Sequence, residues 1–89
     1  MAIPKLYSIR YTESAAHFLK ELDPRTRGRI SAKISALATD PFPPGNRKIR
    51  GEERARRIRI GDYRVVYDVL EELIVVLVLR IGHRKDVYR

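Results

Sequence analysis

Apolar and polar positions follow two different periods along this chain, and the period changes near its middle. Residues 5–11, KLYSIRY, alternate loosely and are rich in tyrosine and β-branched side chains, which predicts a short strand. Between residues 13 and 40 apolar side chains recur every three or four positions, the spacing of an amphipathic helix. After residue 55 the stretches RRIRI, YRVVYDVL and LIVVLVLRI favour strands. The pattern therefore predicts the order β-α-α-β-β-β.

Two start signals divide the helical region into two helices. Thr12 is a suitable N-cap for the first, and Asp23 followed by Pro24 gives the N-cap and first position of the second. Pro41 ends the second helix, because the residue before a proline is disfavoured in the helical conformation. We expect a helical hairpin packed on one face of a single antiparallel sheet, an α+β fold, with residues 40–55 forming a loop.

The last three strands are expected to form a meander. The sequence GD at 61–62 is a two-residue turn with glycine first, and this turn places Arg59 opposite Arg64, on the same face as Arg57. Like charges directly opposed across strands are destabilising. Either an anion lies between the two guanidinium groups, whose forked donors grip phosphate in two places, or the long side chains splay apart in solvent. The spacing alone leaves both interpretations open.

The register of the final strand stays open. A two-residue turn at residues 71–72 would place Leu79 opposite Arg64, and a longer turn would place Arg80 there instead. That strand runs into the tail GHRKDVYR at residues 82–89, where Gly82 breaks the apolar pattern. We expect the tail to bring polar side chains to the rim of the face that carries Arg64.

The net charge of the chain gives information about its binding partners rather than about its fold. The 89 residues include 19 Lys and Arg against 11 Asp and Glu, a net charge of +8. Residues 47–64 hold eight basic side chains and only three acidic ones. Such an excess draws a protein to polyanions, most simply nucleic acid, although a surface kept for solubility or covered by an acidic partner is the plainer alternative.

The cysteine content and the length of the apolar runs exclude several classes of protein. There is no cysteine, hence no disulfide and no thiolate zinc site. The longest apolar run, residues 73–79, is too short to span a bilayer, and the N-terminus lacks the apolar segment of a signal peptide. We expect a single domain over residues 1–89, soluble and cytoplasmic, with no membrane partner and no metal or other cofactor. His17 stands alone and is interpreted as a surface histidine.

Three stretches resemble one protein family over nearly the whole chain: RKIRG (47–51), RRIRIGDYRVVYDV (56–69) and IGHRKDVY (81–88). They are similar to the RelE/ParE superfamily of bacterial and archaeal toxins, and to its RelE branch in particular. The resemblance implies the RelE-like microbial RNase-type fold and the toxin of a type II toxin–antitoxin system. It also implies a ribosome-dependent endoribonuclease, or mRNA interferase, that inhibits translation by cutting A-site mRNA. The implied mechanism is metal-free attack by the 2′-hydroxyl, and the implied partners are a RelB-like antitoxin, the ribosome and its mRNA.

The family's functional residues map onto this chain position by position. The family has two lysines on the first meander strand, an arginine on the second, an arginine after the third and a tyrosine near the end. The resemblance thus implies a catalytic set to which we add the neighbouring histidine: Arg59, Arg64, Arg84, Tyr88 and His83. Other basic side chains are expected to bind RNA or the ribosome: Lys48, Arg50, Arg56, Arg57 and Lys85.

One departure from the family concerns proton transfer. Arg57 and Arg59 stand where the family has lysines, and an arginine stays charged, so Arg59 can stabilise a phosphorane but is a poor general base. His83 is the neighbouring side chain of the type that titrates near neutral pH, which makes it a candidate acid or base. Its plainer roles are to bind phosphate or to close a turn.

Two other functions stay open. The ParE branch shares the fold, poisons DNA gyrase and lacks the RelE catalytic set, whereas here basic residues occupy RelE-like positions. The chain is alternatively a catalytically weak homologue that only binds its antitoxin, an interpretation that the exchange of lysine for arginine permits.

Overall fold

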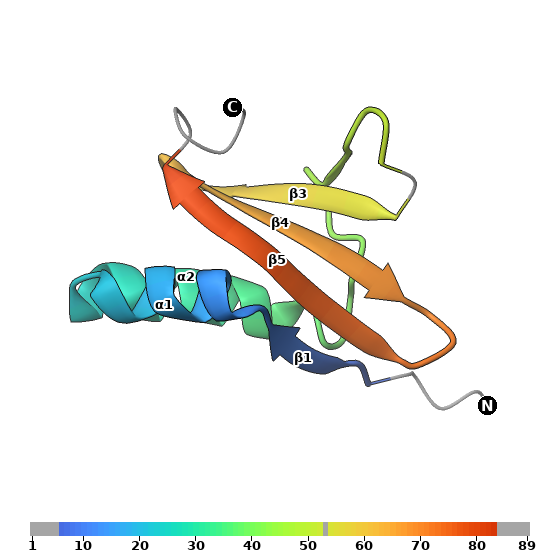
Figure 1. Ribbon diagram of the computed structural model, residues 1–89, viewed down its shortest axis with the longest axis horizontal. Coiled ribbons are helices and arrows are strands. Elements are labelled where there is room, and N and C mark those ends of the chain that lie inside the picture. The colour runs from blue at the N-terminus through green and yellow to red at the C-terminus, as the bar shows by residue number, and fades with distance from the viewer. Residues whose placement is uncertain (1–5, 53, 84–89) are drawn as a thin grey trace.

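The structure is a computed structural model that describes residues 6–52 and 54–83. Its elements are β1 (Ser8–Tyr11), α1 (Glu13–Glu21), α2 (Pro24–Ala36), β2 (Arg47–Lys48), β3 (Ala55–Ile60), β4 (Tyr63–Leu70) and β5 (Val75–His83). The strands form one sheet in the order β1-β5-β4-β3-β2, and both helices lie on the same side of it (Figure 1). The predicted α+β class, helical hairpin and C-terminal meander are confirmed, with the short β2 added inside the predicted loop.

Both predicted N-caps are formed. The Thr12 hydroxyl oxygen accepts the backbone N–H of Ala15 at 3.2 Å, and the Asp23 carboxylate accepts that of Thr26 at 3.0 Å. The hydrogen bond from Thr26 lowers the pKa of Asp23. Thr12 also donates its hydroxyl to the Leu79 carbonyl at 2.6 Å. The cap therefore ties the start of α1 to β5 as well as satisfying the helix.

The sheet is mixed, which corrects the expectation of an antiparallel sheet. β1 pairs with β5 in parallel, Ser8 opposite Val75 and Tyr11 opposite Val78, whereas every other pairing is antiparallel. The two strands are separated by the helical hairpin and most of the meander, so no tight turn sets their relative direction. Periodicity within a strand carries no information on that direction.

The two hairpins of the meander differ in how well the sequence predicts them. Arg59 faces Arg64 across the Gly61 turn, as expected. In the second hairpin the turn takes four residues, 71–74, and a bulge lies between Val66 and Tyr67 in the pairing. As a result Gly82 faces Arg64, and neither expected register holds.

One hydrophobic core lies between the helices and the sheet. The helices contribute Ala15, Leu19, Ile30, Ile34 and Leu37, and the sheet contributes Ile58, Ile60, Val65, Tyr67, Val69, Val76, Val78 and Ile81. Among residues 6–52 and 54–83, no helix lies over the other side of the sheet (Figure 1). Among the described residues no helix is both long and apolar enough to cross a membrane.

Candidate phosphate-binding site on the uncovered sheet face

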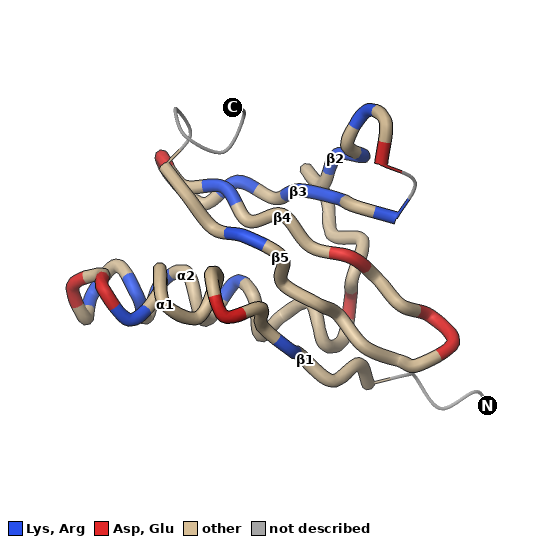
Figure 2. The backbone as a smooth tube through the Cα atoms, viewed as in Figure 1, with Lys and Arg blue, Asp and Glu red and all other residues tan. Residues whose placement is uncertain are grey.

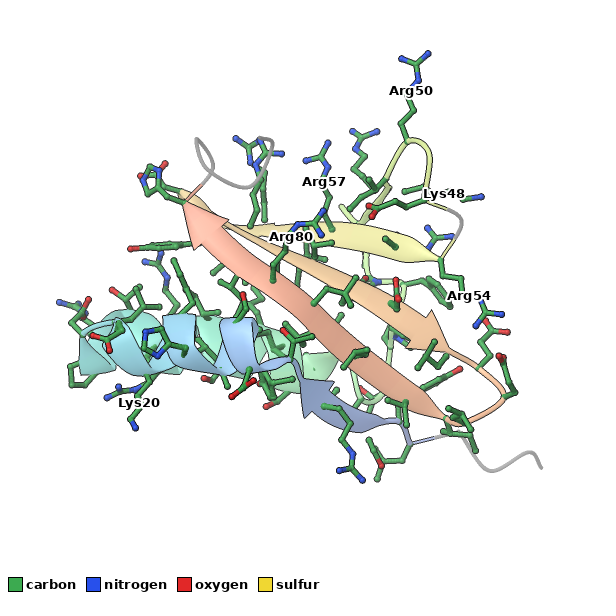
Figure 3. All side chains as sticks on the ribbon, viewed as in Figure 1. Lys20, Lys48, Arg50, Arg54, Arg57 and Arg80 are labelled. Atoms are coloured by element: carbon green, nitrogen blue, oxygen red, sulfur yellow. The ribbon has the colours of Figure 1, made fainter. Side chains whose placement is uncertain are left out.

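Of the residues that the structure describes, five arginines from four strands lie on the sheet face without helices. Residues paired across neighbouring strands point to the same face, so Arg47, Arg57, Val66 and Arg80 form one row, and Arg59, Arg64 and Gly82 form the next. We call the five cations Arg47, Arg57, Arg59, Arg64 and Arg80 the arginine face. Figure 2 shows basic positions gathered on β3, at the start of β4 and on β5. In Figure 3 the Arg57 side chain points away from the helices.

Arg59 and Arg64 sit at the end of this face nearest the β3–β4 turn. Arg59 is exposed, whereas Arg64 is half-buried and its Nε and Nη1 atoms are shielded from solvent. On the other flank of Arg64 lies Gly82, which has no side chain to fill the space above the sheet. Guanidinium groups stay charged at all ordinary pH values and offer paired donors that match phosphate oxygens. The pair is therefore suited to hold a phosphate group between two cations.

Acidic side chains lie toward the opposite end of the face. Arg80 is 3.7 Å from Glu52, so part of its charge is balanced by an ion pair. Burial raises the pKa of Asp68, the charge of Glu52 raises it further, and the nearby Arg54 and Arg80 oppose that rise. The acidic side chains Glu52 and Asp68 therefore lie beside Arg80, whereas Arg59 is exposed at the other end of the face.

A groove of about 760 Å³ runs along the β3 edge next to these arginines. It lies between the C-terminal half of α2, the loop of residues 39–45 and the strands, and β2 covers the outer edge of β3 only opposite Arg56 and Arg57. Its charged lining side chains are Lys33, Asp40, Arg47, Arg57, Arg59 and Arg64. Five cations against one carboxylate make this groove attractive to an anionic chain.

The Arg56 side chain lies on the other side of β3 and stabilises the loop that precedes β2. Its Nη1 donates to Oδ1 of Asn46 at 2.8 Å, and its guanidinium carbon lies 4.7 Å from the centroid of the Phe42 ring. The Tyr67 hydroxyl donates to the Pro41 carbonyl at 2.8 Å, and burial raises the pKa of Tyr67 to about 12. Both side chains hold the loop that walls the groove. The alternation of RRIRI already places Arg56 and Arg57 on opposite faces of the strand. In the sequence, this alternation is the signal that could have excluded Arg56 from the expected RNA-binding residues.

The structure does not bring His83 together with the arginine face. His83 pairs with Tyr63, and its ring meets the Tyr63 ring edge-on with centroids 5.7 Å apart. The Tyr63 ring in turn packs edge-on against the ring of Phe18 in α1, with the two ring centroids 6.2 Å apart. The imidazole therefore lies on the helix-covered side of the sheet, opposite to Arg59 and Arg64.

The other predicted residues are scattered or lie outside the described part of the chain. Lys48 and Arg50 are exposed on β2 and the loop after it. Lys48 pairs with Arg56 and so lies on the other side of the sheet from the arginine face, and Arg50 projects away from the sheet (Figure 3). Arg84, Lys85 and Tyr88 lie outside the described residues. Within residues 6–52 and 54–83 no three His, Asp or Glu side chains cluster in a way that could hold a metal ion.

Two cations of the face were missing from the predicted site. Arg47 joins it through the two-residue strand β2, which the proline-rich stretch before it conceals in the sequence. Arg80 joins it because the β5 bulge shifts the register. No periodic signal marks either event.

Comparison with known proteins gives a consistent result. The family model for the ParE toxin of the type II toxin–antitoxin system parDE matches residues 9–88. Toxin RelG of Mycobacterium tuberculosis is 33% identical over 87 residues, which cover 93% of this chain and 97% of that protein.

Solved structures agree with the sequence relatives. The RelBE2 toxin–antitoxin complex of M. tuberculosis contains a chain with a TM-score of 0.77 and 28% identity, covering 89% of this chain and 99% of that one. A chain of the intact Escherichia coli RelBE toxin–antitoxin complex also has a TM-score of 0.77 and 28% identity, covering 86% and 95% of the two chains.

Proposed function

The chain belongs to the RelE/ParE superfamily and is a RelE-like toxin of a type II toxin–antitoxin system, and from this premise we propose that it is a ribosome-dependent endoribonuclease that cuts mRNA in the A site. The observation that carries the proposal is the Arg59–Arg64 pair on the uncovered sheet face. Two permanent cations in that position suit the scissile phosphate, whose charge increases in the transition state.

In the proposed reaction the 2′-oxygen of one nucleotide attacks the adjacent phosphorus, and the bond from phosphorus to the 5′-oxygen breaks. The 2′-hydroxyl loses a proton, the leaving 5′-oxygen gains one, and a 2′,3′-cyclic phosphate remains. Arg59 and Arg64 bind the non-bridging oxygens through charge-assisted hydrogen bonds. We assign Arg84 to the same task and Tyr88 to stacking on a base or orienting the phosphate. Lys48, Arg50, Arg57 and Lys85 bind flanking RNA or the ribosome.

His83 is assigned a packing role in this proposal, because its ring contacts Tyr63 on the helix side. The variant His83→Phe keeps an aromatic ring against Tyr63 and removes the titratable nitrogens. A maximal single-turnover rate close to that of the native protein supports packing. A fall by about 10²–10⁴, the usual contribution of a general acid or base, assigns proton transfer to His83 instead.

The partner proposed for the free toxin is an antitoxin, since two of the similar solved chains are in toxin–antitoxin complexes. An acidic or amphipathic segment lying over Arg59 and Arg64 would neutralise both cations and block RNA. Hydrogen exchange on the complex should then show protection at residues 56–64 and from residue 81 onward. Protection confined to the outer faces of the helices, with activity still blocked, contradicts this arrangement. The two proposed partners, the antitoxin and the ribosome, are cytoplasmic, which supports a cytoplasmic location for the toxin.

Primer extension on an mRNA incubated with purified ribosomes tests the nuclease directly. Cuts within codons should appear with the native protein, disappear with Arg64→Ala and persist with Arg10→Ala, a charge on the far edge strand β1. Absence of cuts with the native protein contradicts the proposal.

The second candidate function is inhibition of DNA gyrase, which the match to the ParE family model favours. It predicts double-strand DNA breaks in induced cells while mRNA stays intact. The same induced cells therefore distinguish the two functions.

A further inference from the structure

Helix α2 carries a column of positive charge. Arg25, Arg29 and Lys33 are spaced four residues apart, and all three side chains are exposed. Four residues advance a helix by about 6 Å and a little more than one turn, so the three charges follow one flank over about 12 Å. We call them the α2 stripe. The flank formed by Gly28, Ser31 and Ser35 carries no charge. The fourth cation of α2, Arg27, points to a different side of the helix from the stripe and donates to the backbone carbonyls of Lys20 and Leu22.

The stripe is unfavourable for the helix itself. Like charges at i and i+4 destabilise a helix, and α2 contains no aspartate or glutamate to offset them. Within the described part of the chain the ion pairs are Arg54 with Glu72 and Arg80 with Glu52, and His17 lies 3.8 Å from Glu21. None of them involves the stripe. An external anion is the natural complement of three uncompensated cations in a column.

The stripe continues into the arginine face. Lys33 lines the groove beside β3 together with Arg57 and Arg59. A Cβ atom added to Gly61 would lie 2.6 Å from Nη2 of Arg29, so that guanidinium occupies the space over the β3–β4 turn. Gly61 leads from the strand of Arg59 to that of Arg64, and its φ of 60° is a further reason for glycine there. Positive charge therefore runs from the sheet face, around the β3 edge, onto α2.

We propose that the α2 stripe is a second RNA-binding surface that holds the sugar–phosphate backbone outside the nucleotide being cut. Salt-dependent contacts from lysine and arginine to phosphates are independent of base sequence, as a site beside a cleavage centre requires. This inference rests on the proposed function and extends its RNA site beyond the arginine face. The backbone belongs either to the mRNA flanking the cut or to ribosomal RNA.

Two double variants with equal net charge test the stripe. Arg25→Gln with Lys33→Gln removes its two ends and leaves Arg29 on the turn, and Arg10→Gln with Lys20→Gln removes two exposed charges elsewhere. In Figure 3 the Lys20 side chain points away from the sheet. Binding is measured against salt for a 2′-O-methyl RNA 20-mer, which lacks the attacking hydroxyl, and for purified ribosomes without mRNA. A charge-keeping variant, Arg25→Lys with Lys33→Arg, separates charge from helix stability.

The stripe variant should lower the slope of log K against log salt by about 1.4, since each lost single-strand phosphate contact removes about 0.7. That corresponds to a loss of about 10–30-fold in affinity at 0.1 M salt, and the charge-keeping variant should bind like the native protein. Loss on the 20-mer identifies the mRNA backbone, and loss on ribosomes alone identifies ribosomal RNA.

The inference is overturned if the stripe variant and the Arg10/Lys20 variant lose equal affinity for RNA. It is also overturned if the charge-keeping variant fails to bind RNA. These binding results are independent of cleavage. A protein that binds RNA through the stripe yet leaves mRNA intact contradicts only the proposed nuclease.

Discussion

Arg59 and Arg64 face each other directly across the β3–β4 hairpin, on the side of the sheet that α1 and α2 leave uncovered. Two guanidinium groups in that relationship repel each other in the free protein and attract the same anion when one is present. A site of this kind costs stability in order to bind phosphate. Stability and activity should therefore respond in opposite directions when one of the charges is removed.

Replacing Arg59 with threonine should stabilise the protein and inactivate it. The free energy of unfolding should rise by about 0.2–1 kcal/mol, because a like-charge cross-strand pair is removed. The mRNA cleavage rate should fall by about 10²–10³, the usual effect of losing one preorganised donor. Urea unfolding and single-turnover cleavage measure the two effects. The control Arg10→Thr, whose cross-strand neighbour is Leu77, should leave the rate unchanged. A destabilised Arg59→Thr variant contradicts the repulsion argument.

Arg56→Lys should weaken the fold although it conserves charge. Lysine lacks the planar fork that reaches Asn46 while covering the Phe42 ring, so we expect a loss of about 1–2 kcal/mol in the free energy of unfolding. Thermal or urea unfolding measures the loss, and Arg50→Lys on the exposed loop is the matched control. An unchanged free energy of unfolding in Arg56→Lys would show that the fold requires only a positive charge at residue 56 and not the planar guanidinium group.

Asp68→Asn should stabilise the protein at pH 7 and lose that advantage in acid. Burial, followed by the charge of Glu52, raises the pKa of Asp68 above its ordinary value of 3.8. Ionisation is therefore harder in the folded state than in the unfolded state, and the carboxylate costs stability at neutral pH. The cost falls as pH drops through the folded pKa and is absent below the unfolded one. Unfolding free energies of both proteins between pH 3 and 7 test this, and a gain independent of pH would contradict it.

Ile74 is the position where backbone strain can be measured. Its φ is 54°, a left-handed conformation that β-branched residues rarely adopt. Ile74→Gly and Ile74→Ala both remove the apolar side chain, so their difference isolates the backbone. The glycine variant should be more stable by about 1 kcal/mol, since a Cβ atom costs about 1–2 kcal/mol in this region. Chemical denaturation of the two variants measures the difference, and an alanine variant of equal or greater stability would show that the turn relaxes.

Local features of this protein were predictable from the sequence by itself. The caps at Thr12 and Asp23, the two helices and the Arg59–Arg64 pairing all depend on residues close together in the chain. Hydrogen bonds to a helix start and the geometry of a two-residue turn are decided within a few residues, so their patterns are legible. The resemblance to a toxin family in turn depended on motifs within single strands.

Only the tertiary structure decided what those elements form together. The parallel docking of β1, the bulge that sets Gly82 opposite Arg64 and the position of His83 beside Tyr63 all join segments far apart in the chain. A shift of one residue in the β4–β5 register moves every later side chain of β5 to the opposite face. Turn length and bulge position determine that shift, and the packing of the whole core selects both. Periodicity within a strand reveals neither the turn length nor the bulge position. For this reason the sequence did not predict that Arg80 lies on the arginine face and His83 on the opposite face.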